Sequence, residues 1–231
     1  MLLSAGLIPS LSKCRGVLAV VTALCGLGAA NPAWAAIFEN PITGTNPNTS
    51  NPYTTGQTVD PNITASGIGR GSGIAGNAAN DRYNANSWNT VSIDLTAYFT
   101  FTLTPNSGYQ IDFTSLVYTA QASGTGPSSF AFRSSVDSFA ANIGTPNSTG
   151  TTIDLSGGAY QDVSSAIEFR LYGWGASAAS GTFSVNSFTF DGTVSAVPEP
   201  TTWALIIFGS VGGVVGMGKL VRRRWRPAAA L

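Results

Sequence analysis

The chain contains no histidine, and its two cysteines, Cys14 and Cys25, both lie near the N-terminus. The absence of histidine excludes the most common general base, the serine-type catalytic triad and most zinc sites. Residues 36–195 contain no cysteine, so this region has no disulfide, thiolate nucleophile or cysteine metal ligand. Its stability must come from the burial of apolar surface, for which a domain of about 160 residues suffices.

Charged residues are also scarce, at 10% of the chain, and the two signs are segregated. Between positions 36 and 200 there are four basic and eleven acidic residues, which gives a net charge of −7. The seven other basic residues flank two apolar segments, one near each end of the chain. Basic flanks stay cytoplasmic while a weakly charged region crosses the membrane, so the pattern is typical of an exported protein. An acidic exported domain argues against nucleic-acid binding, which requires clustered Lys and Arg.

The N-terminal segment, residues 1–35, is typical of a secretory signal peptide. Two basic residues precede an apolar run without charge at 16–30. The tripeptide Ala-Trp-Ala at 33–35 then matches the small-x-small pattern that signal peptidase recognises, so the expected cut lies before Ala36. The sequence therefore predicts export through the general secretion machinery.

Residues 36–195 show the pattern of an all-β domain. Apolar and polar residues alternate in four segments, 97–103, 109–113, 130–133 and 167–172. Alternation bounded by Pro, Asn and Gly is the signal for half-buried antiparallel strands, and no stretch here has a helical period with caps. We therefore predict an antiparallel, jelly-roll-like β-sandwich, with further short strands at 36–39 and 62–68.

The pattern also predicts local irregularities. In 111–118 and in 183–190 the apolar residues switch from odd to even positions. Such a slip turns the apolar face outward unless a β-bulge absorbs the extra residue, so we expect bulges near Thr114-Ser115 and near Asn186-Ser187. Residues 104–108, Thr-Pro-Asn-Ser-Gly, have the composition of a hairpin loop between the strands on either side.

The segment 40–89 is rich in residues that favour turns and loops: Asn, Thr, Gly, Pro and Ser. A disordered linker is one interpretation of this composition. Large apolar residues recur through the segment, which favours long loops on an ordered domain. They are Ile63, Ile68, Ile74, Tyr83 and Trp88.

The C-terminal segment, residues 196–231, has three parts in a fixed order. Val197-Pro198-Glu199-Pro200 comes first, an apolar run at 203–221 follows, and Arg222, Arg223, Arg224 and Arg226 come last. A helix over the apolar run would reach about 28 Å, close to the roughly 30 Å of a bilayer core. Arginine near a membrane centre costs about 2.5–3.5 kcal/mol, so we expect the basic end to stop transfer and stay cytoplasmic.

This arrangement resembles the PEP-CTERM sorting signal of exosortase substrates. The resemblance covers about the last 35 residues, and Pro198, Glu199 and Pro200 match its motif. It implies that an exosortase, a membrane-embedded cysteine-type transpeptidase, cuts near the motif. The protein would be anchored briefly in the inner membrane with its C-terminus in the cytoplasm, then released to the cell surface or extracellular matrix. The segments 98–105, 123–127, 130–137 and 169–174 also resemble the β-rich domain often joined to this tail, which implies no particular activity.

Three aromatic residues are candidates for a carbohydrate platform, because aromatic faces stack on sugar rings. They are Trp174, Tyr172 and Trp88, and the glycines on either side of Trp174 would leave it on a loop. The alternative is that these rings fill the core or its rim. An exopolysaccharide is the expected ligand of such a platform.

The positions of the charged residues in the domain favour structural roles over catalytic ones. Arg133 and Asp137 lie four residues apart across a predicted turn, where we expect an ion pair that holds the loop. Asp94, Asp137, Asp154 and Asp191 are candidate calcium ligands, although neither EF-hand nor repeat spacing supports such a site. No other cofactor is expected.

A hydrolase would need two carboxylates that face each other across roughly 5–10 Å. Asp112, Asp154 and Glu168 have the required chemistry, but each lies at an outward position of a strand or in a turn. The sequence therefore favours a non-catalytic surface or matrix protein over a carbohydrate-binding module, and both over a secreted hydrolase.

Overall fold

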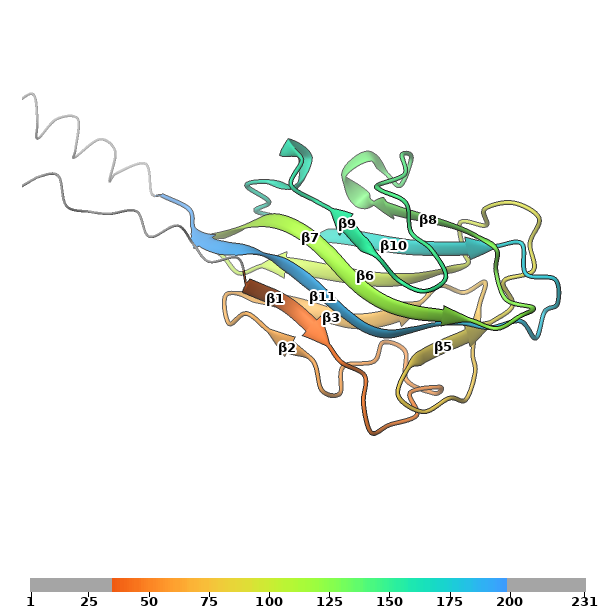
Figure 1. Ribbon diagram of the computed structural model, residues 1–231. Coiled ribbons are helices and arrows are strands. Elements are labelled where there is room, and N and C mark those ends of the chain that lie inside the picture. The colour runs from red at the N-terminus through yellow and green to blue at the C-terminus, as the bar shows by residue number, and fades with distance from the viewer. Residues whose placement is uncertain (1–34, 199–231) are drawn as a thin grey trace, which may run out of the picture. The chain divides into compact units, whose positions relative to one another are not determined.

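The computed structural model describes residues 35–198, which fold as an antiparallel β-sandwich (Figure 1). Eleven strands and two short 3₁₀ helices make up this part of the chain. The signal peptide, the membrane segment at 203–221 and the basic end were predicted for residues outside the described range. Val197 and Pro198 are the part of the sorting motif that lies within it.

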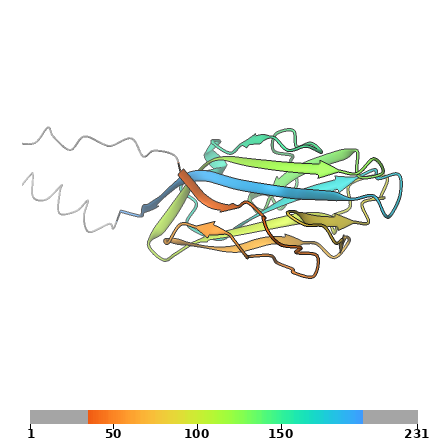
Figure 2. The same ribbon diagram turned by 60° about the horizontal axis from the view of Figure 1, so that its bottom comes forward.

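Two sheets form the layers of the sandwich (Figure 2). The four-stranded sheet has the order β3 (Ile63–Arg70), β6 (Tyr98–Pro105), β10 (Ile167–Trp174) and β8 (Ser129–Ser134). The seven-stranded sheet contains β1 (Ala35–Asn40), β2 (Thr58–Val59), β4 (Ala75–Gly76), β5 (Tyr83–Asn86), β7 (Tyr109–Ala122), β9 (Thr152–Asp154) and β11 (Phe183–Ala196). From β6 onward, each strand lies in the opposite sheet from the strand before it.

The long strand β11 organises the seven-stranded sheet. One of its edges pairs with β7 over almost its whole length, and the other edge pairs with β1 and β5. The ladder between β7 and β11 slips at Asn186, which has no partner, and again at Thr114. Both predicted bulges are therefore confirmed. Each absorbs one residue and keeps the apolar side chains on both sides of it facing inward.

The predicted hairpin around residues 104–108 is wrong. The segment does form a turn, in which the Tyr109 N–H donates to the Asn106 carbonyl at 3.0 Å. The strands that it joins, β6 and β7, belong to different sheets. Strand β6 and the first part of β7 carry their apolar residues at odd positions, and these side chains meet in the same core from opposite layers.

Aromatic rings dominate the core between the sheets. Phe190 on β11 lies at its centre, because five other rings lie within 6.4 Å of its centroid. They are Phe38, Phe101, Phe113, Phe169 and Phe188. Most of these pairs have edge-to-face or tilted geometry, which aromatic quadrupoles favour.

The Asn- and Gly-rich segment at 40–89 is ordered, as predicted, and its five large apolar residues are all buried. Arg70 holds its loops together. The buried guanidinium lies 3.7 Å from the centre of the Tyr83 ring and has no carboxylate partner within residues 35–198. It donates instead to four carbonyl oxygens, those of Pro47, Asn48, Ser50 and Asn84. Backbone dipoles and one aromatic face thus stabilise the buried cation, although its Nε has no hydrogen-bond partner among residues 35–198.

Replacement of Phe190 by alanine tests the centre of the core. We expect Phe190→Ala to lower the free energy of unfolding by about 3–5 kcal/mol, because it leaves a cavity that five rings cannot fill. Urea unfolding of the two proteins measures the difference. Val91→Ala is the control, since Val91 is 98% exposed and its loss should change stability by less than about 0.5 kcal/mol. Equal losses in the two variants would contradict this view of the core.

Tyr83 makes stability depend on pH in the alkaline range. Its hydroxyl donates to the Ser50 carbonyl at 3.0 Å, and burial raises its pKa to about 12, although the charge of Arg70 partly opposes this shift. Above pH 10 the unfolded chain releases the phenolic proton before the folded protein does, so stability should fall between pH 10 and 12, by up to about 2 kcal/mol from this group. Burial also raises the pKa of Tyr118 to about 12 and raises that of Tyr172, so Tyr83→Phe should remove part of the decline measured by urea unfolding at pH 9 and pH 11.5. An unchanged decline in Tyr83→Phe would show that this phenol is not held protonated.

Candidate binding face of the four-stranded sheet

The outer face of the four-stranded sheet carries polar and aromatic side chains. On β6 buried and half-buried residues alternate without a break, as the sequence predicts, so Tyr98, Thr100 and Thr102 point away from the core. The same alternation on β10 places Glu168 and Arg170 on this face. We call this surface the outer face.

Arg170 is the most constrained side chain of the outer face. Its Nε donates to Glu168 Oε1 at 2.7 Å, which is the single ion pair within residues 35–198. Its guanidinium carbon lies 4.3 Å from the centre of the Tyr98 ring and 3.8 Å from that of Phe139. The side chains of Arg170 and Glu168 are 21% and 30% exposed. A guanidinium that is fixed by a carboxylate and two rings presents its remaining N–H groups in one orientation.

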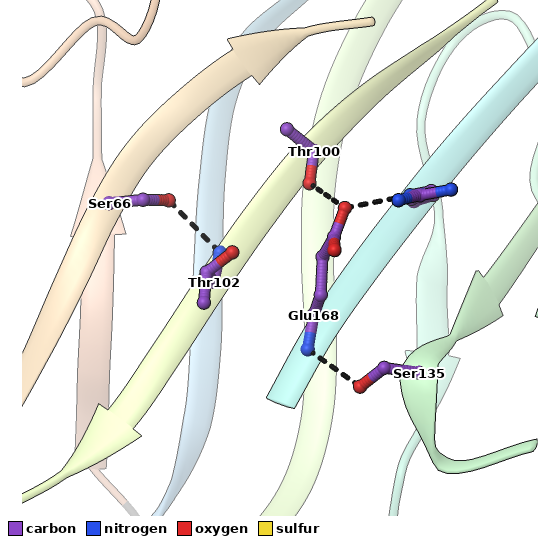
Figure 3. A network of polar contacts seen from close by, with 6 residues as sticks. Ser66, Thr100, Thr102, Ser135 and Glu168 are labelled. Atoms are coloured by element: carbon purple, nitrogen blue, oxygen red, sulfur yellow. Dashed lines mark hydrogen bonds and ion pairs between the residues drawn. The ribbon is translucent and has the colours of Figure 1, made fainter. Parts of the chain in front are cut away.

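Glu168 is fixed from several sides (Figure 3). The Thr100 hydroxyl donates to the same carboxylate oxygen at 2.9 Å, and the Glu168 backbone N–H donates to Ser135 Oγ at 3.0 Å. Nearby, Ser66 Oγ accepts from the backbone N–H of Thr102 at 3.0 Å, where a bulge in β3 interrupts its ladder with β6. Serine hydroxyls thus replace missing backbone acceptors beside the site, which keeps the sheet regular under Glu168.

Tyr172 lies on the outer face but is covered by its neighbours. Its ring meets Tyr98 edge to face at 5.4 Å, directly across the ladder between β6 and β10. The Arg133 guanidinium lies 5.8 Å from the ring centre. Burial raises the pKa of Tyr172, and the neighbouring Arg170 guanidinium partly offsets this shift.

The loop after β8 supplies the ring of Phe139. Ser138 and Phe139 both have left-handed backbone, with φ of 59° and 62°, which is strained for a residue as large as Phe. The Phe139 N–H donates to the Ser134 carbonyl at 2.8 Å, and Arg133 Nη1 donates to the Phe139 carbonyl at 3.0 Å. These bonds hold the ring over Arg170.

The predicted ion pair between Arg133 and Asp137 is absent from this loop. Arg133 Nε donates to Asn142 Oδ1 at 2.8 Å, whereas the Asp137 carboxylate accepts from the backbone N–H groups of Ala140 and Ala141. Both residues do stabilise the loop, but through different partners. The N–H groups of the turn that follows Asp137 satisfy its carboxylate, so the carboxylate does not need the guanidinium as a partner.

The structure contradicts the predicted carbohydrate platform at two of its three residues, which are buried. Trp88 is fully buried, packs against Phe99 and Phe183, and donates from Nε1 to the Ala85 carbonyl at 2.9 Å. Tyr172 is buried as well. Trp174 is the last residue of β10, paired with Ser129, and does not lie on a loop as predicted. It is half-buried at an outer-face position and is the one residue of the three that stays accessible.

Tyr98 was missed by sequence reasoning. Its even position in the alternating segment places it outside the core, but only the register of β6 against β10 brings it beside Tyr172 and Arg170.

The described part of the sorting motif continues directly from the sheet. The Val197 N–H donates to the Gly108 carbonyl at 2.8 Å, next to the last pair of the ladder, Ala196 with Tyr109. Pro198 is exposed and has no N–H to extend the ladder. Glu199, Pro200 and the four predicted stop-transfer arginines lie outside the described residues.

The candidate calcium ligands are not brought together. Asp94 accepts from Thr96, Asp154 from the Ser156 N–H, and Asp191 from the Ser115 hydroxyl. No group of three or more Asp, Glu, His or Cys side chains that could hold a metal occurs within residues 35–198. Of the candidate hydrolytic carboxylates, Asp112 and Asp154 belong to the seven-stranded sheet and Glu168 to the other layer.

Comparison of the chain with protein families, curated proteins and solved structures finds no match. No helix in the described part of the chain is long and apolar enough to cross a membrane.

Tryptophan fluorescence tests whether Trp88 is buried and Trp174 is accessible. Residues 36–200 contain only Trp88 and Trp174. In this fragment we expect iodide to quench the emission of Trp174 in Trp88→Phe, but not that of Trp88 in Trp174→Phe, because the ion cannot enter the core. Equal quenching of the two variants would contradict the placement of Trp88.

Proposed function

We propose that the chain is an exported, non-catalytic cell-surface or extracellular-matrix protein that exosortase sorts and processes through its C-terminal tail. The observation that carries the proposal is the order of the three parts of the tail. A Pro-Glu-Pro motif is followed by an apolar run of nineteen residues, long enough as a helix to span a bilayer, and then by a cluster of arginines. Signal peptidase and the general secretion machinery are the expected partners at the other end. The protein would be held in the inner membrane by the tail, with its C-terminus cytoplasmic, until exosortase cuts.

The bounds of the sandwich support this proposal. Strand β1 begins at Ala35, beside the expected signal-peptidase cut, and β11 ends at Ala196, immediately before the motif. Within the sheet Ala36 pairs with Asp191, so the first and last strands are neighbours. Cuts at the two expected places would leave every strand from Ala36 to Ala196 in the exported product.

A second candidate function is carbohydrate binding, with exopolysaccharide as the partner. The outer face favours it, since Trp174 and Tyr98 are partly accessible beside the fixed pair of Arg170 and Glu168. Nucleic-acid binding is not proposed, because acidic residues outnumber basic ones in the domain. The finer fold class that we propose is a jelly-roll-like sandwich, which the repeated crossings between sheets and the pairing of β1 with β11 support.

Removal of the tail tests the sorting proposal. In the native host, a chain that ends at Ala196 should lose membrane processing and change its mature size and destination. Because this deletion also removes the bond from Val197 to Gly108, a second variant leaves the sandwich intact. It replaces the four arginines at 222, 223, 224 and 226 with glutamine, which removes the charge that retains the terminus. Trp174→Ala is the control and should be processed normally, as immunoblots of cell fractions would show. Unchanged size and destination in both tail variants would refute the proposal.

A further inference from the structure

We propose that the outer face of the four-stranded sheet binds an uncharged polysaccharide. In this arrangement Arg170 and Glu168 hydrogen-bond to the sugar hydroxyls, and Tyr98 and Trp174 contact the sugar rings. The inference rests on the second candidate function above, carbohydrate binding, and names its site and the class of its ligand.

The pair of Arg170 and Glu168 offers a donor and an acceptor side by side. In their contacts with the rest of residues 35–198, Arg170 uses Nε and Glu168 uses Oε1. Within residues 35–198 neither Nη group of Arg170 donates to a carbonyl or carboxylate oxygen and Glu168 Oε2 accepts no hydrogen bond, and both side chains are partly exposed. A sugar hydroxyl both donates and accepts, so neighbouring hydroxyls of one ring match an adjacent carboxylate and guanidinium.

The aromatic residues extend this pair into a row. Glu168, Arg170, Tyr172 and Trp174 occupy successive outward positions of β10, and Tyr98 lies across the ladder from Tyr172. Trp174 lies six positions after Glu168 along the strand. At about 3.3 Å per residue, the two residues are about 20 Å apart, which is long enough for several sugar rings. The row therefore suits a chain molecule better than a single sugar.

Charge favours an uncharged chain over an acidic one. The described residues include ten acidic and four basic side chains. One of the four, Arg70, is buried, and Glu168 compensates the charge of Arg170. An acidic polymer would meet net repulsion from the domain. Arg133, the one cation beside the site without a carboxylate partner within residues 35–198, already donates to Asn142 Oδ1 and to the Phe139 carbonyl. A neutral polymer loses nothing to that repulsion.

Retention on immobilised polysaccharides tests the inference with the full chain in a mild detergent. The probes are a neutral glucan, mannan and galactan, and alginate as an acidic polymer. We expect retention on a neutral polymer that changes little with salt, and at least a roughly tenfold loss of affinity in Trp174→Ala and in the double variant Glu168→Gln/Arg170→Gln. Thr193→Ala is the matched control, because Thr193 is a half-buried residue of β11, in the other sheet, and should have no effect. Thermal unfolding of each variant confirms that it is folded.

The outcomes separate the site, the ligand class and the function. Neutral retention that neither outer-face variant reduces would overturn the site but not carbohydrate binding. Retention on alginate alone, abolished by salt, would overturn the ligand class. Absence of retention on every polymer would overturn both the inference and the second candidate function, and would leave the sorting proposal to its own test.

Discussion

Strand β11 is hydrogen-bonded along both edges, and its inward face carries the rings around which the two sheets close. A strand of fourteen residues keeps one face inward only if its register is corrected along the way. The bulge at Asn186 makes that correction within β11, and the bulge at Thr114 makes it in its partner β7. Without the first bulge, either Phe183 or Phe190 would point to solvent, and without the second, either Phe113 or Leu116 would. The core therefore depends on two residues that have no partner in the ladder.

The packing of the two sheets against each other also determines where a binding site can lie. Aromatic rings fill the interior, so ligand chemistry is confined to outer surfaces and loops. The outer face of the four-stranded sheet differs from the core by holding its rings beside charged side chains. Arg170 shows the contrast with Arg70: both stack on a tyrosine, but Arg70 is enclosed by carbonyl oxygens, whereas Arg170 stays partly exposed beside a carboxylate. Arg70 therefore stabilises the fold, whereas Arg170 is the residue that we propose contacts a ligand.

Period-two patterns predicted most of the architecture, because the side chains of a strand alternate regardless of what the strand pairs with. The long strands, their buried faces and both bulges followed from this local property, whereas the short strands β2, β4, β5 and β9 were not predicted. Pairing did not, because residues 104–108 have the composition of a turn whether it joins neighbouring strands or two layers. The burial of Trp88 likewise depends on contacts with Phe99 and Phe183, which are distant in sequence.

The polar sites were harder to predict than the core. Arg133 and Asp137 have the right spacing for an ion pair, yet backbone N–H groups satisfy the aspartate. The carbonyl ligands of Arg70 come from loop backbone, which leaves no signal in side-chain identity. Tyr98 and Arg170 meet only through the register of β6 and β10. Such sites arise from tertiary geometry, so residue type and spacing alone do not define them.

Because β1 and β11 pair with each other, the folded unit is complete only when both strands are kept. The intact mass of the protein recovered from outside the cells tests this claim most directly. If the folded unit requires both strands, the exported product has its N-terminus at Ala36 and its C-terminus at or beyond Val197, so that both cuts leave the strand pairing intact. An exported product that begins after Phe38 or ends before Val194 would contradict it.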